Sequence, residues 1–351
     1  MIDQEGYRVQ RWGEDPTWER FAAAAPGPGE ARLAIEACGV GLTVLNAIRG
    51  DLADDRATLP RVPGHELVGR VAEVGSGVPP SLIGRRMVAY FYLFCGDCPE
   101  CVAGAENRCR RLAGYVGVHV DGGYAPAATL PVRNLVEVPD GLDPVEATVV
   151  PDAVATSIHV CRSRARVGPE DRVAVIGAGG GVGVHLVQVA RLFGATVAGL
   201  DVSEPKLATI GELDAIPIDS ADFDRLDAGL FSGDRPTVIA DLLGTRASFD
   251  WATRAVEPGG RIVVLTTFRD REAALDRRAL VLTETAVLGS RYASRHEVRL
   301  AGDLVAEGRV RAIVGQTTAA RDAPELHRRL REGSLVGRGA LVWGPQSGGR
   351  Q

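Results

Sequence analysis

The sequence lacks long apolar runs, is poor in aromatic residues and has no basic cluster. None of its 351 residues falls in a run of 18 or more apolar residues, whereas a transmembrane helix needs about 20. Aromatic residues make up 5% of the chain, charged residues 24%, and the formal net charge is −5. We therefore expect no membrane span and no nucleic-acid partner, since a basic patch would be needed for the latter. A small molecule is the expected partner.

The N-terminal stretch also lacks the features of a targeting segment. It reads "MIDQEGYRVQRWGEDP", which is polar and of mixed charge, without the apolar centre of a secretory signal peptide. We interpret the protein as cytoplasmic. The length corresponds to about two domains.

Cysteine is sparse except in one stretch, "CGDCPECVAGAENRC". It contains Cys95, Cys98, Cys101 and Cys109 with the spacing C-x2-C-x2-C-x7-C. Thiolates at such short intervals can converge on one tetrahedral zinc, and four of them leave no open coordination position. The sequence therefore predicts one structural zinc, with an iron–sulfur cluster as the alternative. The two remaining cysteines, Cys38 and Cys161, are expected to be small buried residues.

The pattern of apolar residues changes near residue 150. Before it, short strand-like runs such as "ARLAIEA", "LVGRVAEVG", "RMVAYFYL" and "NLVEVP" alternate with Gly/Pro turns, which indicates a barrel-like β domain. After it, strands and helices alternate, which predicts βαβ units and a parallel sheet. The last segment is again strand-rich and is expected to pair with the first domain. The fold class is therefore α/β, with domains at 1–150 plus 290–351 and at 151–289.

The second domain begins with a nucleotide-binding pattern. In "VIGAGGGVGVHLVQVARLFGATVAGLD" a strand ends at Ile176, a glycine loop and a helix follow, and a second strand ends in Asp201. Glycines allow a pyrophosphate to approach the backbone, and the helix N-terminus supplies N–H groups for it. Asp201 can accept hydrogen bonds from the ribose hydroxyls and would repel a 2′-phosphate, which favours NAD(H) over NADP(H). Lys206 could reach the same ribose, or could be an ordinary surface lysine. The loop residues expected to bind the cofactor are Gly177, Gly179, Gly180, Gly181, Val182 and Gly183.

These motifs together resemble the zinc-containing alcohol dehydrogenase branch of the medium-chain dehydrogenase/reductase superfamily. The resemblance rests on "PGHELVGRV", the four-cysteine stretch and the later glycine loop, and it covers nearly the whole chain. It implies a GroES-like substrate domain, a Rossmann cofactor domain and an active site in the cleft between them. It also implies that Thr156 lies beside the nicotinamide, that Arg338 reaches the phosphates, and that the chain forms a homodimer or homotetramer.

One stretch departs from the family pattern. The family usually reads A-C-G-V-C-x-T-D-x-H where this sequence has "ACGVGLTVLN", so that Gly41 replaces the cysteine ligand of the catalytic zinc. Val44 stands in place of the aspartate and Asn46 in place of the proton-relaying histidine. Thr43 keeps the hydroxyl that touches the substrate oxygen. We therefore expect the catalytic zinc to be absent.

The other residues of the family's catalytic site are present. His65 matches the histidine ligand, Glu66 follows it, and Asp152 lies where the family has a cysteine or aspartate. Without metal, these three should hold an imidazolium between carboxylates or keep one carboxyl protonated, and either form could act as an acid, unless they are only a relic ion pair. Phe91 or Tyr92 in "YFYLF" is a candidate for the pocket wall, with core packing as the alternative.

Three functions remain open at this stage. The first is an NAD(H)-dependent oxidoreductase that acts on an activated C=O, C=N or C=C bond without catalytic zinc, with Thr43, His65, Glu66 and Asp152 as its catalytic residues. The second is a conventional zinc alcohol dehydrogenase with an atypical metal site. The third is a non-redox protein, either a lyase or epimerase that uses bound NAD or a cofactor-binding sensor.

Overall fold

The computed structural model describes residues 2–266 and 269–344. It divides into two compact units. The first comprises residues 1–152, 293–308 and 314–351, and the second comprises residues 153–292 and 309–313. Within the described residues, no helix is both long and apolar enough to cross a membrane.

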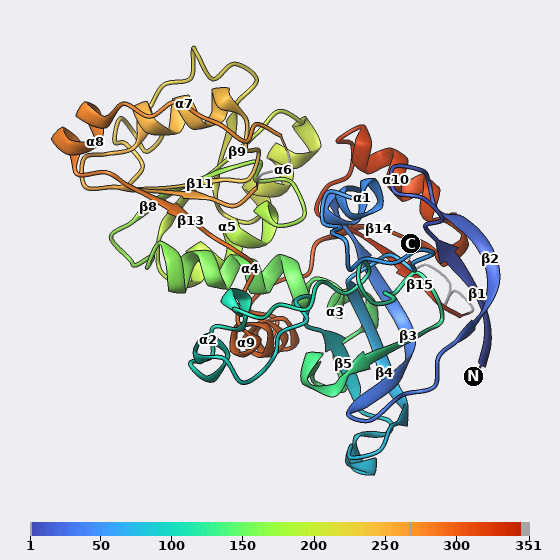
Figure 1. The fold of residues 1–351 in the computed structure, drawn as a ribbon. Helices are drawn as coiled ribbons and strands as arrows, with labels where there is room; N and C mark the ends of the chain where they lie inside the picture. Colours follow the sequence, from blue (N-terminus) through green and yellow to red (C-terminus); the bar gives the residue numbers. More distant parts are fainter. Residues whose placement is uncertain (1, 267–268, 345–351) are drawn as a thin grey trace. The chain divides into compact units, whose positions relative to one another are not determined.

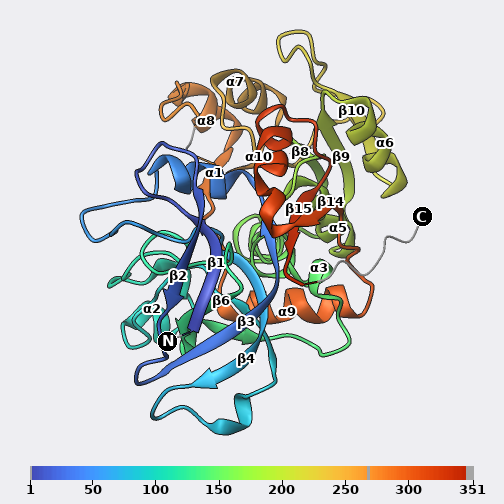
Figure 2. The same cartoon turned by 90° about the vertical axis from the view of Figure 1, so that its right-hand side faces the viewer.

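The first unit contains a seven-stranded sheet, in which β3 is the longest strand. The order is β14-β15-β3-β4-β5-β7, and β6 also pairs with β3. All neighbours are antiparallel except β14 and β15. The strands are β3 (Glu30–Val40), β4 (Glu66–Val74), β5 (Arg86–Ala89), β6 (Ala127–Pro131), β7 (Leu135–Glu137), β14 (Val314–Ala319) and β15 (Arg338–Val342). The C-terminal strands β14 and β15 thus return to the first unit, as expected, and Figures 1 and 2 show α10 beside them.

Short helices connect these strands, and an N-terminal hairpin joins them. The hairpin pairs β1 (Ile2–Arg8) with β2 (Thr17–Ala23) and is visible at the left of the first unit in Figure 2. The α-helices of this unit are α1 (Leu42–Arg49), α2 (Pro99–Val102), α3 (Pro144–Ala147), α9 (Arg295–Ala306) and α10 (Ala323–Arg331). The 3₁₀ turns are η1 (Pro80–Leu82), η2 (Glu106–Arg108), η3 (Val132–Asn134) and η6 (Ala320–Asp322).

The aromatic run after β5 is not a continuation of the strand, although the sequence predicts a strand through "RMVAYFYL". β5 ends at Ala89. Beyond it, the side-chain amide of Asn134 donates to the carbonyl oxygens of Tyr90 (2.9 Å) and Tyr92 (2.8 Å). This buried asparagine takes the place of a strand partner, so that the backbone carbonyls stay satisfied while the chain turns.

The second unit is a six-stranded parallel sheet with the order β10-β9-β8-β11-β12-β13. This is the doubly wound order, in which successive strands are added first on one side of β8 and then, from β11 onward, on its other side. The strands are β8 (Arg172–Ile176), β9 (Thr196–Asp201), β10 (Ile216–Asp219), β11 (Val238–Asp241), β12 (Arg261–Val264) and β13 (Ala286–Gly289). The Rossmann-type parallel sheet expected from the sequence is therefore confirmed.

Helices cover both faces of the parallel sheet. Figure 1 shows α7 and α8 above it and α5 below it. The helices are α4 (Ala155–Ile158), α5 (Gly183–Leu192), α6 (Glu204–Glu212), α7 (Arg246–Ala255) and α8 (Arg277–Thr283), and the π-helical turns η4 (Val150–Val154) and η5 (His159–Arg164) flank α4. Buried Ile176, Leu200, Ile239 and Trp251 belong to the core on one side of the sheet. Because a parallel strand is buried on both faces, the strands of this sheet are continuous apolar runs, which the sequence pattern predicts as strands.

One buried histidine in α10 predicts a pH dependence of stability. His327 is 2% exposed, and its Nε2 lies 2.9 Å from the hydroxyl of Tyr124. Burial first, and then Arg331, lower the pKa of His327 to about 4, with Asp15 opposing. In the unfolded chain the His327 imidazole is protonated below about pH 6.5, whereas in the folded chain it is protonated only below about pH 4. The contribution of neutral His327 to the free energy of unfolding is therefore fully present above pH 6.5 and is lost as the pH falls toward 4.

We expect wild-type protein to lose about 2 kcal/mol more unfolding free energy between pH 7.5 and pH 5 than His327→Gln, which cannot titrate, at roughly 1.4 kcal/mol per pKa unit. Urea unfolding at the two pH values measures this difference. Parallel losses in the two proteins would contradict the prediction.

Candidate functional site

Strand register brings together the residues of the first candidate site. β15 pairs antiparallel with β3, and the register places Arg338 at the level of Gly41. On its other side β3 pairs with β4, with Gly39 opposite Glu66. Side chains two residues apart on an extended chain point to the same face. Glu66 and Arg338 therefore lie beside Gly39 of β3 and Gly41 just after its end, two positions on the same face that both lack a side chain.

The side chains meet in a buried charge cluster, defined here as His65, Glu66, Asp152 and Arg338. The Nη2 atom of Arg338 lies 2.9 Å from Oε1 of Glu66 and 2.7 Å from Oδ2 of Asp152. Nε2 of His65 lies 3.5 Å and 3.7 Å from the same two oxygens. Arg338, Glu66 and His65 are 4%, 0% and 3% exposed, and Asp152 is half-buried. The sequence predicted that His65, Glu66 and Asp152 lie together, and the structure adds Arg338 to them.

Burial and the neighbouring charges of the cluster act on the Glu66 carboxyl in opposite directions. Burial raises the pKa of the Glu66 carboxyl to about 7, the positive charge of Arg338 opposes this rise, and Asp152 reinforces it. Two carboxylates this deep in the protein are costly unless a cation pairs with them. Phe91 closes one side of the cluster, because its ring lies 4.2 Å from that of His65 between centroids, at an interplanar angle of 31°.

Gly39 and Gly41 provide the space that the cluster needs. A Cβ on Gly39 would lie 2.9 Å from Cβ of Glu66 and would overlap its carboxylate. A Cβ on Gly41 would overlap Nη1 of Arg338 and lie 2.7 Å from its Cζ. Gly41 has φ −128° and ψ 178°, an extended conformation open to any residue, so its backbone does not require glycine. The guanidinium of Arg338 is what excludes a side chain at position 41.

The residues that follow Gly41 lie on α1. Thr43 is half-buried in the first turn of this helix. Asn46 is buried, and its Oδ1 accepts a hydrogen bond of 2.6 Å from Nη2 of Arg49. This interaction occupies the acceptor oxygen of the residue that stands in the place of the family's histidine. Cys38 is fully buried, and among the described residues it does not belong to either group of side chains that could share a metal ion.

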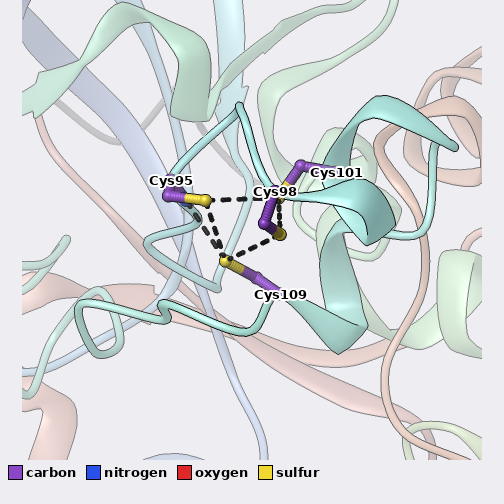
Figure 3. Close-up of side chains that lie close together, drawn as sticks. All are labelled: Cys95, Cys98, Cys101 and Cys109. Carbon is purple, nitrogen blue, oxygen red and sulfur yellow. Dashed lines mark hydrogen bonds between the residues drawn. The ribbon is translucent and has the colours of Figure 1, made fainter.

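The four cysteines form the second candidate site (Figure 3). Their sulfur atoms approach one another at 3.4 Å (Cys98–Cys101), 3.5 Å (Cys95–Cys109), 3.9 Å (Cys95–Cys101) and 4.0 Å (Cys98–Cys109). Four thiolates each about 2.3 Å from a central zinc would be about 3.8 Å apart. The residues therefore fit a closed tetrahedral zinc site, in which all four positions are taken by protein and none is left for a substrate.

The third candidate site is the glycine loop between β8 and α5. A Cβ on Gly183 would overlap the carbonyl oxygen of Gly177 and lie 2.7 Å from Cα of Ala178. Glycine at the start of α5 therefore lets the helix pack directly against the loop, with its free N–H groups at the loop end. Val182 is the N-cap residue of α5. Gly179, Gly180 and Gly181 lie in the loop, as the sequence predicted.

Asp201 is at the end of β9, beside this loop. Its Oδ2 accepts a hydrogen bond of 2.9 Å from the N–H of Gly179, and its Oδ1 accepts one of 2.9 Å from Val202. Nζ of Lys206, the single lysine of the sequence, lies 3.8 Å from Oδ1. Each carboxylate oxygen keeps a second lone pair for a ligand hydroxyl. Thr156 is buried in α4 of the same unit.

Comparison with known proteins shows the family to which the chain belongs. A family model described as an alcohol dehydrogenase GroES-like domain matches residues 27–140, and one described as a zinc-binding dehydrogenase matches residues 181–307. An alcohol dehydrogenase of Geobacillus stearothermophilus is 33% identical over 314 residues, which are 88% of this chain and 90% of the relative. An acryloyl-coenzyme A reductase of Metallosphaera sedula is 31% identical over 293 residues, 82% of this chain and 85% of the relative. The solved structure of acetophenone reductase from Geotrichum candidum NBRC 4597 in complex with NAD has a TM-score of 0.87 and 27% identity, and covers 97% of each chain.

The chain belongs to the zinc-containing alcohol dehydrogenase branch of the medium-chain dehydrogenase/reductase superfamily. It is an NAD(P)-dependent oxidoreductase.

Two features of this dehydrogenase were not foreseen from its sequence. The resemblance assigned Arg338 to the cofactor phosphates, and that role stays a prediction, whereas in the structure its guanidinium is part of the charge cluster. His185 was missed altogether. It is fully buried in α5, with Nδ1 2.7 Å from the carbonyl oxygen of Gly181 and Nε2 accepting from the N–H of Ile313 at 3.1 Å. This side chain therefore fixes the glycine loop to the 309–313 segment, and its place in the first turn after the loop was the available clue.

The four-cysteine site predicts the zinc content of the purified protein. We expect about one zinc per chain rather than two, because one closed thiolate site is complete and the charge cluster lacks the cysteine ligand. Cys98→Ser should lose this zinc together with stability, since structural zinc contributes to folding. His65→Ala should keep it, as should the control Cys161→Ala. Two zincs per chain by elemental analysis, with one lost in His65→Ala, would refute this prediction.

Asp201 predicts a preference for the unphosphorylated cofactor. We expect NADH to bind at least about tenfold more tightly than NADPH, a difference of roughly 1.4 kcal/mol, because the carboxylate repels a 2′-phosphate. Asp201→Asn should narrow this ratio, and Lys206→Met should widen it, because its ammonium group offsets part of the repulsion. Fluorescence titration gives the dissociation constants, and equal values for the two cofactors in the wild-type protein would contradict the assignment.

Proposed function

We propose that this protein is an NAD(H)-dependent oxidoreductase that transfers hydride to or from an activated C=O, C=N or C=C bond without a catalytic zinc. It holds one structural zinc at the four cysteines and works in the cytoplasm as a homodimer or homotetramer. The observation that carries the proposal is at position 41, where the family's cysteine ligand is replaced by glycine and the vacated space contains the guanidinium of Arg338.

The charge cluster does not fit a zinc ion in this arrangement. The candidate ligand atoms of His65, Glu66 and Asp152 lie within 4.8 Å of one another, which is close enough for a shared ion. However, both carboxylates already pair with Arg338, whose charge cannot be removed at physiological pH. A divalent ion would have to displace this cation or tolerate its repulsion.

The remaining residues can support hydride chemistry. Bound NAD(H) supplies or accepts the hydride itself. Thr43 donates a hydrogen bond to the substrate oxygen or nitrogen, and the Glu66 carboxyl, whose pKa burial raises to about 7, can supply a proton beside His65. Without Lewis-acid polarisation, which contributes several kcal/mol of transition-state stabilisation in metalloenzymes, the substrate must itself be electron-poor. Conjugated enals, conjugated enones and iminium ions meet this requirement, and one relative is named an acryloyl-coenzyme A reductase.

Steady-state assays can separate this proposal from its two alternatives. We expect NADH-dependent reduction of a conjugated enal or enone, or of a cyclic imine, that persists after incubation with a chelator strong enough to strip a weakly held metal. Oxidation of simple primary alcohols should be negligible. Alcohol oxidation that the chelator abolishes would support a conventional zinc enzyme, whereas substrate conversion without net NADH turnover would support a lyase or epimerase.

A variant pair tests the role of Thr43. Thr43→Val should lower kcat/KM for the activated substrate by about a hundredfold, the effect expected on removing one hydrogen-bond donor from a developing charge. Thr43→Ser keeps the hydroxyl and should retain most of the activity. Equal activity of the Val and Ser variants would exclude the hydroxyl from catalysis.

A further inference from the structure

We propose that Arg338 is a resident cation that occupies the family's catalytic metal position, so that this chain excludes metal by occupancy as well as by the loss of a ligand. It follows that removing Arg338 and restoring a cysteine at position 41 together expose a latent metal site. This inference rests on the proposed function only in that both require position 41 to lack a ligand. Metal binding is measured without turnover, so the two can fail separately.

The first support is the mutual fit of positions 338 and 41. The three nearest atoms to a Cβ built on Gly41 all belong to the guanidinium of Arg338. The extended backbone of Gly41 would accept any residue, so a side chain at position 41 conflicts only with the guanidinium of Arg338 in the place that it takes here. With the guanidinium in this place, the space beside Gly41 is filled by a cation instead of by a ligand side chain.

The second support is the charge that the site needs. Glu66 is fully buried and Asp152 half-buried, and both carboxylates face one guanidinium nitrogen at 2.9 Å and 2.7 Å. A buried carboxylate pair without a cation is unstable. In a metalloenzyme a metal ion meets this demand, whereas here the Nη2 atom of Arg338 meets it from the neighbouring strand.

The test uses four proteins: wild type, Gly41→Cys, Arg338→Met and the double variant, each with the four-cysteine site saturated with zinc. Cobalt(II) is the probe, because a cobalt–thiolate bond gives a charge-transfer absorption that free cobalt lacks. We expect a second metal, bound at least about a hundredfold more tightly than in wild type, only in Gly41→Cys/Arg338→Met, where a thiolate, His65 and a carboxylate can surround it. Adding His65→Ala to the double variant should abolish it.

Several results would overturn the inference. Tight cobalt binding by Gly41→Cys alone would mean that Arg338 does not hold the position. No added binding in the folded double variant would mean that the position is not a metal site even when vacant. Weaker NADH binding by Arg338→Met, without any gain in cobalt binding by the double variant, would leave Arg338 with the phosphate role that the sequence predicted.

A second test compares melting temperatures and does not need the cysteine variants to fold. Gly41→Ala should lower the Tm clearly in the wild-type background, because the new methyl group overlaps the guanidinium. In the Arg338→Met background the same change should shift Tm by less than about 1 °C, since the overlap is gone and the two positions are coupled. Equal Tm losses in the two backgrounds would refute the mutual fit of these residues.

Discussion

The pairing of the Arg338 guanidinium with the carboxylates of Glu66 and Asp152 is the interaction on which the charge cluster depends. Arg338 comes from the C-terminal strand β15, Glu66 from β4, and Asp152 from the π-helical turn at 150–154. Three parts of the chain, far apart in sequence, thus converge on one charge. The ion pair therefore ties β15 and β4 to Asp152 within the first unit.

A guanidinium and a zinc ion differ in what they can do for a reaction. Zinc exchanges ligands, polarises a bound oxygen and lowers the pKa of a coordinated water or alcohol. A guanidinium keeps its charge and its donors but can neither coordinate nor titrate. A chain that exchanges one for the other keeps the electrostatic support of its carboxylates and gives up Lewis-acid chemistry. That exchange is consistent with an oxidoreductase whose substrates are already electron-poor and whose cofactor carries the redox step.

The sequence predicted the fold class and several of the close groupings, because these are encoded locally. The buried strands of the parallel sheet read as continuous apolar runs, and the glycine loop, the helix and Asp201 follow one another within 25 residues of chain at 177–201. The cysteine spacing likewise requires only a short loop to converge. His65 and Glu66 are neighbours, and the family pattern supplied Asp152 as their partner.

The position of Arg338 could not be read in the same way, because it depends on the register between β15 and β3. A shift of one residue in that pairing would turn the side chain to the other face of the sheet. The sequence shows Gly41 only as a missing ligand, and the structure shows it as the space for an arginine almost 300 positions away. His185 was missed for a related reason, since its partner Ile313 lies in a distant segment.

The most direct measurement of the central claim is anomalous diffraction at the zinc absorption edge from crystals of the wild-type protein. The account predicts one zinc peak per chain, among Cys95, Cys98, Cys101 and Cys109, and guanidinium density for Arg338 between Glu66 and Asp152. A second zinc peak beside His65 and Asp152, with Arg338 turned away from the carboxylates, would contradict it.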